Sequence, residues 1–404
     1  MANILLIAGG KNQRQLAVDI VQGGHTLFLV DPYHNGPCTD LADIHIQCDT
    51  RHYLDIISEI ELRRISIQGV TSDQSDASLL SVSKVSEYLG LKHMPSSVIK
   101  NCLNKFSQSI VLQEHGVIVP STDLLPSNYL DDSNQLWRKY FKPHINKVII
   151  KPSDSQGSKG VQIVSNRNDL IQNLHYTTKE TVNGEVLIQE YIEGTEYSVD
   201  GVVLNNELHV LAIATKYHYA NNACIDERNT FFGDISLSIY SRLIKSVDMA
   251  AKALRLNNTL IHAELVLSSY RDEIYLIEIS PRGGGGSISS KIIPYITGYS
   301  PTAFLISRCL NQEYPHPLAE FKTNNSKYVV MRFLPNLMCS FRSLKLSNPQ
   351  FSTLIHSEIP DGNGCFREIR DSRDRVGYFV IGNSDLGLLL NDEQHMLNSL
   401  QIIP

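Results

Sequence analysis

The sequence predicts an α/β protein whose N-terminal part contains a parallel sheet. The first observation is a continuous apolar run at residues 3–8, typical of a buried parallel strand and ended by Gly9-Gly10. The second is the alternation that follows: strands at 26–30, 44–47 and 69–71, with helices at 15–22, 53–63 and 77–89. Strands alternating with helices in this way build a parallel, Rossmann-like sheet. No GxGxxG motif is present, so the expected ligand at its strand ends is a substrate in place of a dinucleotide.

Beyond residue 97 the pattern predicts α+β structure. A helix is expected at 98–116, and strands at 148–152 and 161–164. Residues 186–196 are expected to be a strand that passes into a polar connector, followed by strands at 197–204 and 208–215 and a helix at 238–254. Short strands are expected at 328–333, 351–358, 365–369 and 375–381, and a last helix at 392–400. We therefore expect domains at 1–97, 98–185, 186–322 and 323–404, the last a small β-rich module packing on the third.

Composition favours a small-molecule partner over nucleic acid. The chain has 404 residues, 42% of them hydrophobic, a net charge of −6 and no basic block. Seven cysteines without a CxxC pair indicate neither a disulfide framework nor a zinc site, which fits a reducing cytoplasm. With no secretory signal pattern and no apolar run of membrane-spanning length, we expect a cytoplasmic protein with no membrane partner. A homodimer is an open alternative to a monomer.

A hairpin at residues 261–286 carries the strongest chemical signal. Alternation places His262, Glu264 and Val266 on one face of its first strand, and Ile274, Leu276, Glu278 and Ser280 on one face of its second. A turn near Arg271 would set Leu276 opposite Val266 and Glu278 opposite Glu264, with the two carboxylates about 5 Å apart. Like charges in an apolar setting are costly unless a cation neutralises them, and oxygen ligands suit Mg²⁺ or Mn²⁺. The alternative is a half-exposed hairpin with two solvated glutamates.

Two glycine-containing stretches are candidate anion sites. Arg282 is followed by four glycines, which permit close approach of a ligand, and an arginine there can bind phosphate or carboxylate oxygens. Lys151 ends a strand and precedes a Ser-Asp-Ser-Gln-Gly-Ser-Lys-Gly loop whose N–H groups and hydroxyls can face phosphates. The loop is not a Walker A motif because a strand follows it. An ordinary flexible loop is the alternative in both cases.

A strand, a polar connector and a second strand follow at 186–204. Backbone groups leaving a strand edge can pair with an adenine edge, and an acidic residue a few positions later can accept from ribose hydroxyls. Lys216 ends the next strand. The polar segment 221–234 reads as an irregular loop, either substrate-specific or merely solvated, with Asp226, Glu227 and Arg228 as candidate contacts for an amino-acid-like substrate.

The order of these features resembles the ATP-grasp superfamily across nearly the whole chain, and the resemblance implies roles for particular residues. It makes Lys105 and Lys151 the nucleotide lysines, Gly157, Ser158, Lys159 and Gly160 the phosphate-covering loop, Gln189, Glu190 and Ile192 the adenine contacts, and Glu196 the ribose contact. Glu264 and Glu278 correspond to the metal ligands, and Arg282 to the arginine of the superfamily pattern. Beside this resemblance, we expect Arg282 and Lys216 to be the catalytic residues, with the carboxylate phosphorylated next to Arg282. Ser280 departs from the pattern, because the superfamily usually has a metal-binding asparagine there.

The resemblance also implies a fold and a reaction. The four domains become a Rossmann-like domain preceding the ATP-grasp part, a small lid subdomain, a large subdomain and a C-terminal module. Gly9-Gly10-Lys11-Asn12-Gln13, Asp31-Pro32 and the closing Arg-Val-Gly-Tyr segment are similar to the L-amino-acid ligase, biotin carboxylase and purine-biosynthesis branch. The implied reaction uses ATP with Mg²⁺ or Mn²⁺ to activate a small-molecule carboxylate for attack by an amine. An ATP-dependent carboxylase using bicarbonate and a non-catalytic nucleotide-binding protein are the alternatives.

Overall fold

The computed structural model describes residues 1–125, 133–141, 147–233, 235–314 and 327–404. The N-terminal sheet confirms the predicted α/β class. Its strands β1 (Asn3–Ile7), β2 (Thr26–Val30), β3 (Ile44–Ile46) and β4 (Gly69–Thr71) are parallel in the order β3-β2-β1-β4. Helices α1 (Arg14–Gln22), α2 (Tyr53–Leu62) and α3 (Asp76–Tyr88) connect them, each within two residues of the predicted range. The short turn η1 (Lys11–Gln13) leads into α1.

The predicted helix at 98–116 is wrong as a single element. The chain forms α4 (Ser96–Leu103) and α5 (Lys105–Glu114), separated by Asn104, whose backbone is extended. The Asn104 side chain accepts a hydrogen bond from Ser107 N at 2.9 Å and so caps α5. The break has a functional consequence, because it places Lys105 at the first position of a helix.

A four-stranded antiparallel sheet follows, in the order β5-β8-β6-β7. Its strands are β5 (Thr122–Leu124), β8 (Val186–Glu190), β6 (Val148–Pro152) and β7 (Gln162–Val164), and the helices of this region are α6 (Ser133–Tyr140) and α7 (Arg167–Lys179). The interior combines strand residues such as Ile150, Val164 and Ile188 with Leu170 and Leu174 of α7. The glycine-containing loop between β6 and β7 extends from this sheet.

The largest sheet is antiparallel, with the order β13-β12-β9-β10-β11-β14-β19-β17. Its strands are β9 (Gly194–Leu204), β10 (Glu207–Tyr219), β11 (Asn222–Phe231), β12 (Thr259–Ser268), β13 (Ile274–Ser280), β14 (Tyr328–Phe333), β17 (Thr353–Glu358) and β19 (Tyr378–Asn383). The segment predicted as an irregular loop at 221–234 is therefore mostly strand β11, and Asp234 lies outside the described residues. Its alternating polar residues pair with β10 and β14, a non-local pairing that local polarity conceals.

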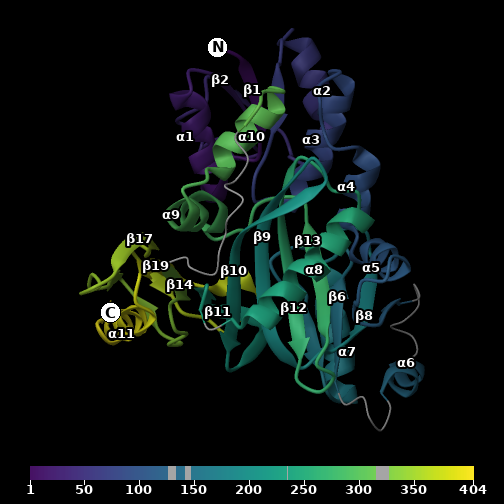
Figure 1. Cartoon of the computed structure of the whole chain (residues 1–404), viewed down its shortest axis with the longest axis vertical. Helices are drawn as coiled ribbons and strands as arrows, with labels where there is room; N and C mark the ends of the chain where they lie inside the picture. The colour runs from purple at the N-terminus through teal and green to yellow at the C-terminus, as the bar shows by residue number, and fades with distance from the viewer. Residues whose placement is uncertain (126–132, 142–146, 234, 315–326) are drawn as a thin grey trace.

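Helix α8 (Leu237–Ala253) covers one face of this sheet, as Figure 1 shows. Alternation turns Val199, Ile261 and Leu265 toward α8 and leaves Glu196, Glu264 and their neighbours on the opposite face. The polar residues of adjacent strands therefore gather on one side of the sheet, where the cavity described below lies.

The β12–β13 hairpin has the predicted pairing of Glu264 with Glu278, but the predicted pairing of Leu276 with Val266 is wrong. Leu276 pairs with Leu265, so Ile277 is an extra residue in β13 and forms a bulge. The bulge resets the alternation. Leu276 is buried in the core beneath α8, whereas Ile277 and Glu278 both face the cavity.

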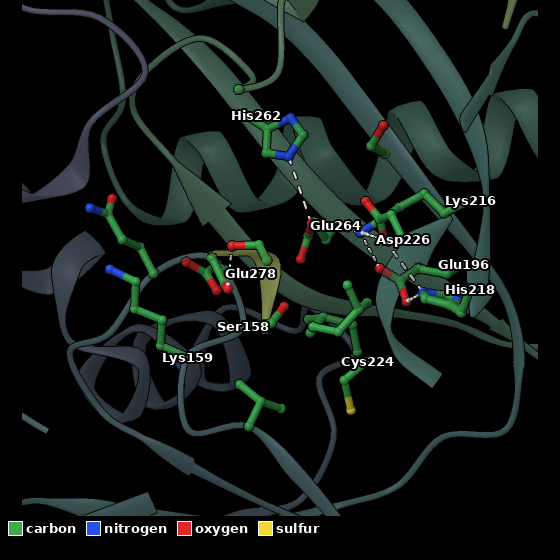
Figure 2. Close-up of a pocket in the computed structure, with 18 of the residues that line it drawn as sticks. Ser158, Lys159, Glu196, Lys216, His218, Cys224, Asp226, His262, Glu264 and Glu278 are labelled. Carbon is green, nitrogen blue, oxygen red and sulfur yellow. Dashed lines mark hydrogen bonds and ion pairs between the residues drawn. The ribbon is translucent and has the colours of Figure 1, made fainter. Parts of the chain in front are cut away.

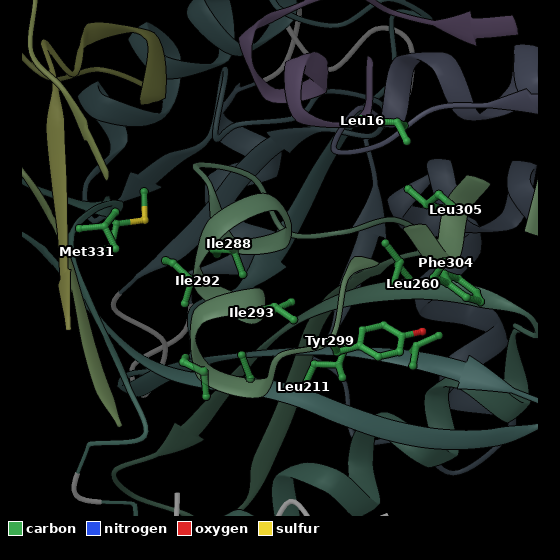
Figure 3. Packing of buried hydrophobic residues seen from close by; sticks show 14 of the residues in the cluster. Leu16, Leu211, Leu260, Ile288, Ile292, Ile293, Tyr299, Phe304, Leu305 and Met331 are labelled. Atoms are coloured by element: carbon green, nitrogen blue, oxygen red, sulfur yellow. The ribbon is translucent and has the colours of Figure 1, made fainter. Parts of the chain in front are cut away.

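Strands of the large sheet also pack against the N-terminal domain, through one shared apolar cluster. After β13 the chain forms a π-helical turn, η2 (Ile288–Ile292), and helices α9 (Ile293–Thr297) and α10 (Pro301–Cys309). Figure 3 shows Ile288, Ile292 and Ile293 packed near Leu211 and Met331 of the sheet, while Phe304 and Leu305 of α10 lie toward Leu16 of α1. This packing fixes the N-terminal strand ends relative to the large sheet.

The C-terminal strands continue the large sheet. Phe379 and Val330 are fully buried against α11 (Leu386–Asn398), which begins six residues earlier than predicted. The strand expected at 365–369 is shorter in the structure: it is β18 (Gly364–Cys365), which pairs with β15 (Ser340–Phe341). A second short pair joins β16 (Ser343–Lys345) to β20 (Gln401–Ile403). The turn η3 (Ser372–Asp374) precedes β19. All seven cysteines are free. Within the described ranges no helix has the length and apolarity needed to cross a membrane.

Candidate active site

A cavity of about 620 Å³ lies where the four-stranded sheet, the large sheet and the N-terminal domain meet. Its walls include most of the residues singled out from the sequence: Lys105, Lys151, Gly157, Ser158, Lys159, Gln189, Glu190, Ile192, Glu196, Lys216, Glu264, Glu278, Ser280 and Arg282. Among the described residues that were assigned to the nucleotide, the metal or catalysis, Gly160 alone lies outside this lining. It is buried, and its carbonyl accepts from Thr177 Oγ1 at 2.7 Å.

The Glu264 and Glu278 carboxylates face this cavity from paired strands, and lysines offset their mutual repulsion (Figure 2). Lys105 Nζ lies 3.1 Å from both oxygens of Glu278, and Lys216 Nζ lies 2.7 Å from Glu264 Oε1. The two ammonium groups thus supply the countercharge that the sequence argument assigned to a metal ion.

Lys216 is enclosed by carboxylates. Its ammonium lies 2.5 Å from Glu196 Oε1, 2.7 Å from Glu264 Oε1 and 3.2 Å from Asp226 Oδ1. Burial by itself would lower the pKa of Lys216, but attraction to these three carboxylates raises it well above the ordinary value. Burial likewise works to raise the pKa of Glu264, and Lys216 with His262 lowers it well below the usual range. Lys216 and Glu264 are therefore both ionised at neutral pH.

Two histidines that sequence reasoning did not assign to the site belong to this cluster. His218 Nε2 is 3.0 Å from Glu196 Oε2, and His262 Nδ1 is 2.9 Å from Asp200 Oδ1. Burial disfavours charge on His262, but Asp200 and Glu264 outweigh it and raise its pKa to about 10. The signal was available for His262, since alternation placed it beside Glu264, but its partner Asp200 lies on β9 and only the sheet order reveals the contact.

Lys151 lies on the other wall. It is 4% exposed, and its Nζ donates to Gln189 Oε1 at 2.9 Å. Burial and then repulsion by Lys105 lower the pKa of Lys151 to about 8, with partial compensation from Glu278 and Glu264. Gln189 donates in turn to Thr122 Oγ1 at 2.7 Å, which fixes its orientation. A buried ammonium without a carboxylate in contact is suited to bind an anion.

The glycine-containing loop closes over Lys151. Gly157 has φ +67°, a conformation that favours glycine, and its carbonyl accepts from Ser372 Oγ at 2.8 Å. Arg373 of the same C-terminal turn lies 3.1 Å from Glu180, which follows α7. Sequence reasoning assigned no chemistry to the C-terminal segment. The structure nevertheless places Ser372, Arg373 and Arg375 in the cavity wall.

The strand β8 and the connector after it form the side wall of the cavity. Gln189, Glu190 and Ile192 line it together with Tyr191, and Arg271 Nη2 holds the Glu190 carboxylate at 2.7 Å. β8 pairs with β6 through Glu190, and the chain then enters β9 at Gly194. The connector therefore links the two antiparallel sheets.

Arg282 forms a two-pronged ion pair with Asp76 of α3, with distances of 2.8 Å from Nε and 2.7 Å from Nη2. Burial works to raise the pKa of Asp76, and Arg282 lowers it. The first two glycines after Arg282 are packed without room for a side chain, since a Cβ on Gly283 would lie 2.8 Å from Asp73 and one on Gly284 would lie 2.4 Å from Asp200. Of these four glycines, Gly285 and Gly286 line the cavity. Asp76 was missed because its partner is 206 residues away.

Asp226, Glu227 and Arg228 were predicted to contact the substrate, and for two of the three the side chain does not face the cavity. Asp226 lines the cavity, but Arg228 and Glu227 do not. Arg228 pairs with Glu393 at 3.3 Å and stacks on Tyr217, and Glu227 accepts from Arg332 Nη2 at 2.7 Å. Pairing within the sheet turns these two side chains toward the C-terminal helix.

Comparison with known proteins agrees with this geometry. Residues 145–291 match the family model "ATP-grasp domain", and residues 74–194 match the model "Tubulin-tyrosine ligase family". A curated relative, carbamoyl phosphate synthase large chain from Lachnoclostridium phytofermentans, is 24% identical over 151 residues, which are 37% of this chain. That match spans 13% of the length of the curated relative.

Solved structures match over nearly the full chain. An L-amino acid ligase from Bacillus licheniformis is 17% identical with a TM-score of 0.79, covering 100% of this chain and 98% of that one. Phosphoribosylglycinamide synthetase from Anaerococcus prevotii is 18% identical with a TM-score of 0.74, covering 100% and 99%. The biotin carboxylase domain of a Hydrogenobacter thermophilus 2-oxoglutarate carboxylase, solved with MgADP, ADP and bicarbonate, is 13% identical with a TM-score of 0.74, covering 99% and 90%. The family match and the full-length structural likeness together show that residues 145–291 match an ATP-grasp domain and that the chain has the ATP-grasp fold.

Proposed function

We propose that this protein is an ATP-dependent ligase that activates a small-molecule carboxylate as an acyl phosphate and joins it to an amine. A carboxylate oxygen of the acid attacks the γ-phosphorus of ATP, and ADP leaves. The amine nitrogen then attacks the acyl carbon, phosphate leaves, and the nitrogen loses a proton as the amide forms. Such chemistry depends on positioning and charge neutralisation more than on covalent work by the protein.

The observation that carries this proposal is the opposed pair Glu264 and Glu278, facing one cavity whose described lining includes seven lysine and arginine side chains. Their oxygen-only donor set fits Mg²⁺ or Mn²⁺, and both carboxylates already hold cationic groups at 2.7–3.1 Å. Bound Mg²⁺ would neutralise phosphate charge. Ser280 lines the same cavity and offers a hydroxyl where the superfamily usually has an asparagine.

Other residues that line the cavity are assigned to the phosphates, the adenine and the ribose of ATP. We assign the nucleotide phosphates to Lys105, Lys151 and the N–H groups of the loop at 157–160, and the adenine to the connector at 189–192. Glu196 is assigned to the ribose. Because Glu196 already contacts Lys216 and His218, ribose binding would share this carboxylate with both.

We place the acid substrate near Arg282 and Arg375. The Asp76 ion pair holds the Arg282 guanidinium in one orientation at the end of β13. The Arg375 guanidinium stacks on Phe333 at 3.7 Å, and its hydrogen bonds go to two carbonyl oxygens, Ser372 O and Asp226 O. Neither bond neutralises its charge, and burial lowers its pKa. A substrate carboxylate would supply the missing negative charge.

The test is ADP formation across a matrix of amino acids, peptides and other acids and amines. Release that requires an acid and an amine together supports the ligase, whereas release that depends on bicarbonate favours the alternative of an ATP-dependent carboxylase. Glu278→Gln should lower ADP formation at least ~100-fold because it removes a charge that a divalent metal requires. Glu207→Gln, an exposed site far from the cavity lining, is the matched control. An undiminished rate in Glu278→Gln would refute the proposal.

A further inference from the structure

A second cavity, of about 690 Å³, lies away from the proposed active site. It forms between the segment 92–95 and helix α10 on one side, and the β9–β10 turn and the α8–β12 loop on the other. Its floor includes Phe304, 3% exposed, and Leu204, 8% exposed. None of the described residues lines both this cavity and the first one. It is comparable in size to ordinary small-molecule sites.

The charge of this cavity is unbalanced. Lys92, Arg255 and Arg308 line it, and Glu313 is the one acidic residue among the described lining residues. None of the three cations has a carboxylate within ion-pair distance in the described part of the chain. A local excess of positive charge in a concave site attracts anions.

Arg308 is the central group. It projects from α10, is partly buried, and makes one hydrogen bond, from Nη1 to Asn258 O at 3.1 Å. Arg282 and Arg332, which are similarly buried, each pair with a carboxylate at 2.7 Å. Burial lowers the pKa of Arg308, since no acidic side chain compensates for its desolvation. A guanidinium in this state has most of its donors available for a ligand.

Two amides in the opposite wall are oriented to donate. Asn257 Oδ1 accepts from the backbone N–H groups of Asn206 at 3.0 Å and Asn258 at 2.9 Å. Asn258 Oδ1 accepts from Asn205 N at 3.4 Å. Since the oxygens are turned to the backbone, the orientation of each amide is fixed and its NH₂ group points away from these contacts. Neither NH₂ group has a hydrogen-bond partner among the described residues.

We propose that this cavity is a second ligand site, which binds a small molecule carrying two or more oxyanion groups. Arg308 binds one phosphate or carboxylate group by its forked guanidinium, with the Asn257 and Asn258 amides as additional donors. Lys92 and Arg255, both exposed at the rim, neutralise a second group. Phosphorylated metabolites and polycarboxylates share this chemistry.

The experiment measures binding of pyrophosphate and, separately, of citrate by isothermal titration calorimetry. The full chain is first saturated with Mg²⁺ and a non-hydrolysable ATP analogue, so that the nucleotide cavity does not contribute. Arg308→Leu is compared with Arg367→Leu, which makes the same charge change at an exposed arginine that lines neither cavity. Lys92→Gln, at an exposed position, is the second variant if Arg308→Leu does not fold.

We expect one molecule of at least one probe to bind per chain, with affinity reduced at least tenfold by Arg308→Leu, about threefold by Lys92→Gln, and unchanged by Arg367→Leu. Stronger binding of pyrophosphate identifies a phosphorylated ligand, and stronger binding of citrate a polycarboxylate. Absence of binding by both probes at millimolar concentration, or equal affinity in the Arg308 and Arg367 variants, would overturn the inference. The result is independent of ligase activity, since the readout is binding alone.

Discussion

The buried Lys151 makes nucleotide binding depend on pH in a way that can be calculated. With a pKa of about 8, lowered by burial and by Lys105, Lys151 loses its proton in a range where ordinary lysines remain charged. The protonated fraction falls from about nine-tenths at pH 7 to about one-tenth at pH 9. If only the charged form binds phosphate, the affinity for Mg-ATP falls about tenfold over this range, equivalent to ~1.4 kcal/mol.

The same pKa predicts proton uptake on binding. Since the bound phosphates favour the ammonium, the protein should take up about 0.1 proton at pH 7, 0.5 at pH 8 and 0.9 at pH 9 through this group. Calorimetry with a non-hydrolysable ATP analogue, in buffers of different ionisation enthalpy, measures this number directly. Lys151→Arg keeps its charge over this pH range, so it should show no proton uptake from this position. Lys151→Met has no charge to titrate, so it should likewise show no uptake, and it should bind the nucleotide weakly at every pH.

Other groups near the cavity also titrate, so the decisive quantity is the difference between the wild-type protein and Lys151→Arg. His262, with a pKa of about 10, contributes equally to both proteins. A wild-type uptake that does not change between pH 7 and pH 9, or that equals the uptake of Lys151→Arg at pH 9, would refute the assignment of a lowered pKa to Lys151.

Three further predictions follow from particular contacts. Because Ser372 Oγ donates to the Gly157 carbonyl at 2.8 Å, Ser372→Ala should speed proteolysis within the loop at 157–159, whereas Mg-ATP should slow it. If neither the substitution nor Mg-ATP changed the cleavage rate, the loop would not be a lid held closed by the C-terminal turn. Arg228→Ala should leave KM and substrate preference unchanged while lowering the free energy of unfolding by ~1–3 kcal/mol, because Glu393 loses a partner. Arg282→Ala, by contrast, should abolish turnover. An altered substrate preference in Arg228→Ala would show that Arg228 contacts the substrate after all. Phe379→Ala, at a fully buried position, should cost ~3–5 kcal/mol in urea unfolding, against less than ~0.5 kcal/mol for Phe351→Ala at a position 64% exposed, and equal costs would contradict the placement of this core.

The alternation of strands and helices in residues 1–89 was enough to predict the parallel sheet. The strands β1, β2 and β4 are short, largely buried runs with a turn signal beside them, and parallel strands buried on both faces leave that pattern in the sequence. The pairing of Glu264 with Glu278 was predicted correctly, but the register next to the turn was not, and only the bulge at Ile277 brings the two glutamates opposite each other. Local rules therefore determined the elements, whereas the exact cross-strand register required the structure.

Other features required the tertiary structure. The strand β11 pairs with β14, Leu276 beside the bulge donates to Ile118 O, and the break at Asn104 is accompanied by contacts to Ser153 and Glu185, all of which lie elsewhere in the chain. The countercharges of the site have the same origin: Lys105 meets Glu278 across 173 residues and Arg282 meets Asp76 across 206. The sequence by itself thus determined which strands, helices and ionisable groups this protein has, whereas only the folded chain decided which charges neutralise one another. The physical reason is that hydrophobic periodicity is a local property, whereas the pKa of a buried group depends on the neighbours that the whole fold brings within a few ångströms of it.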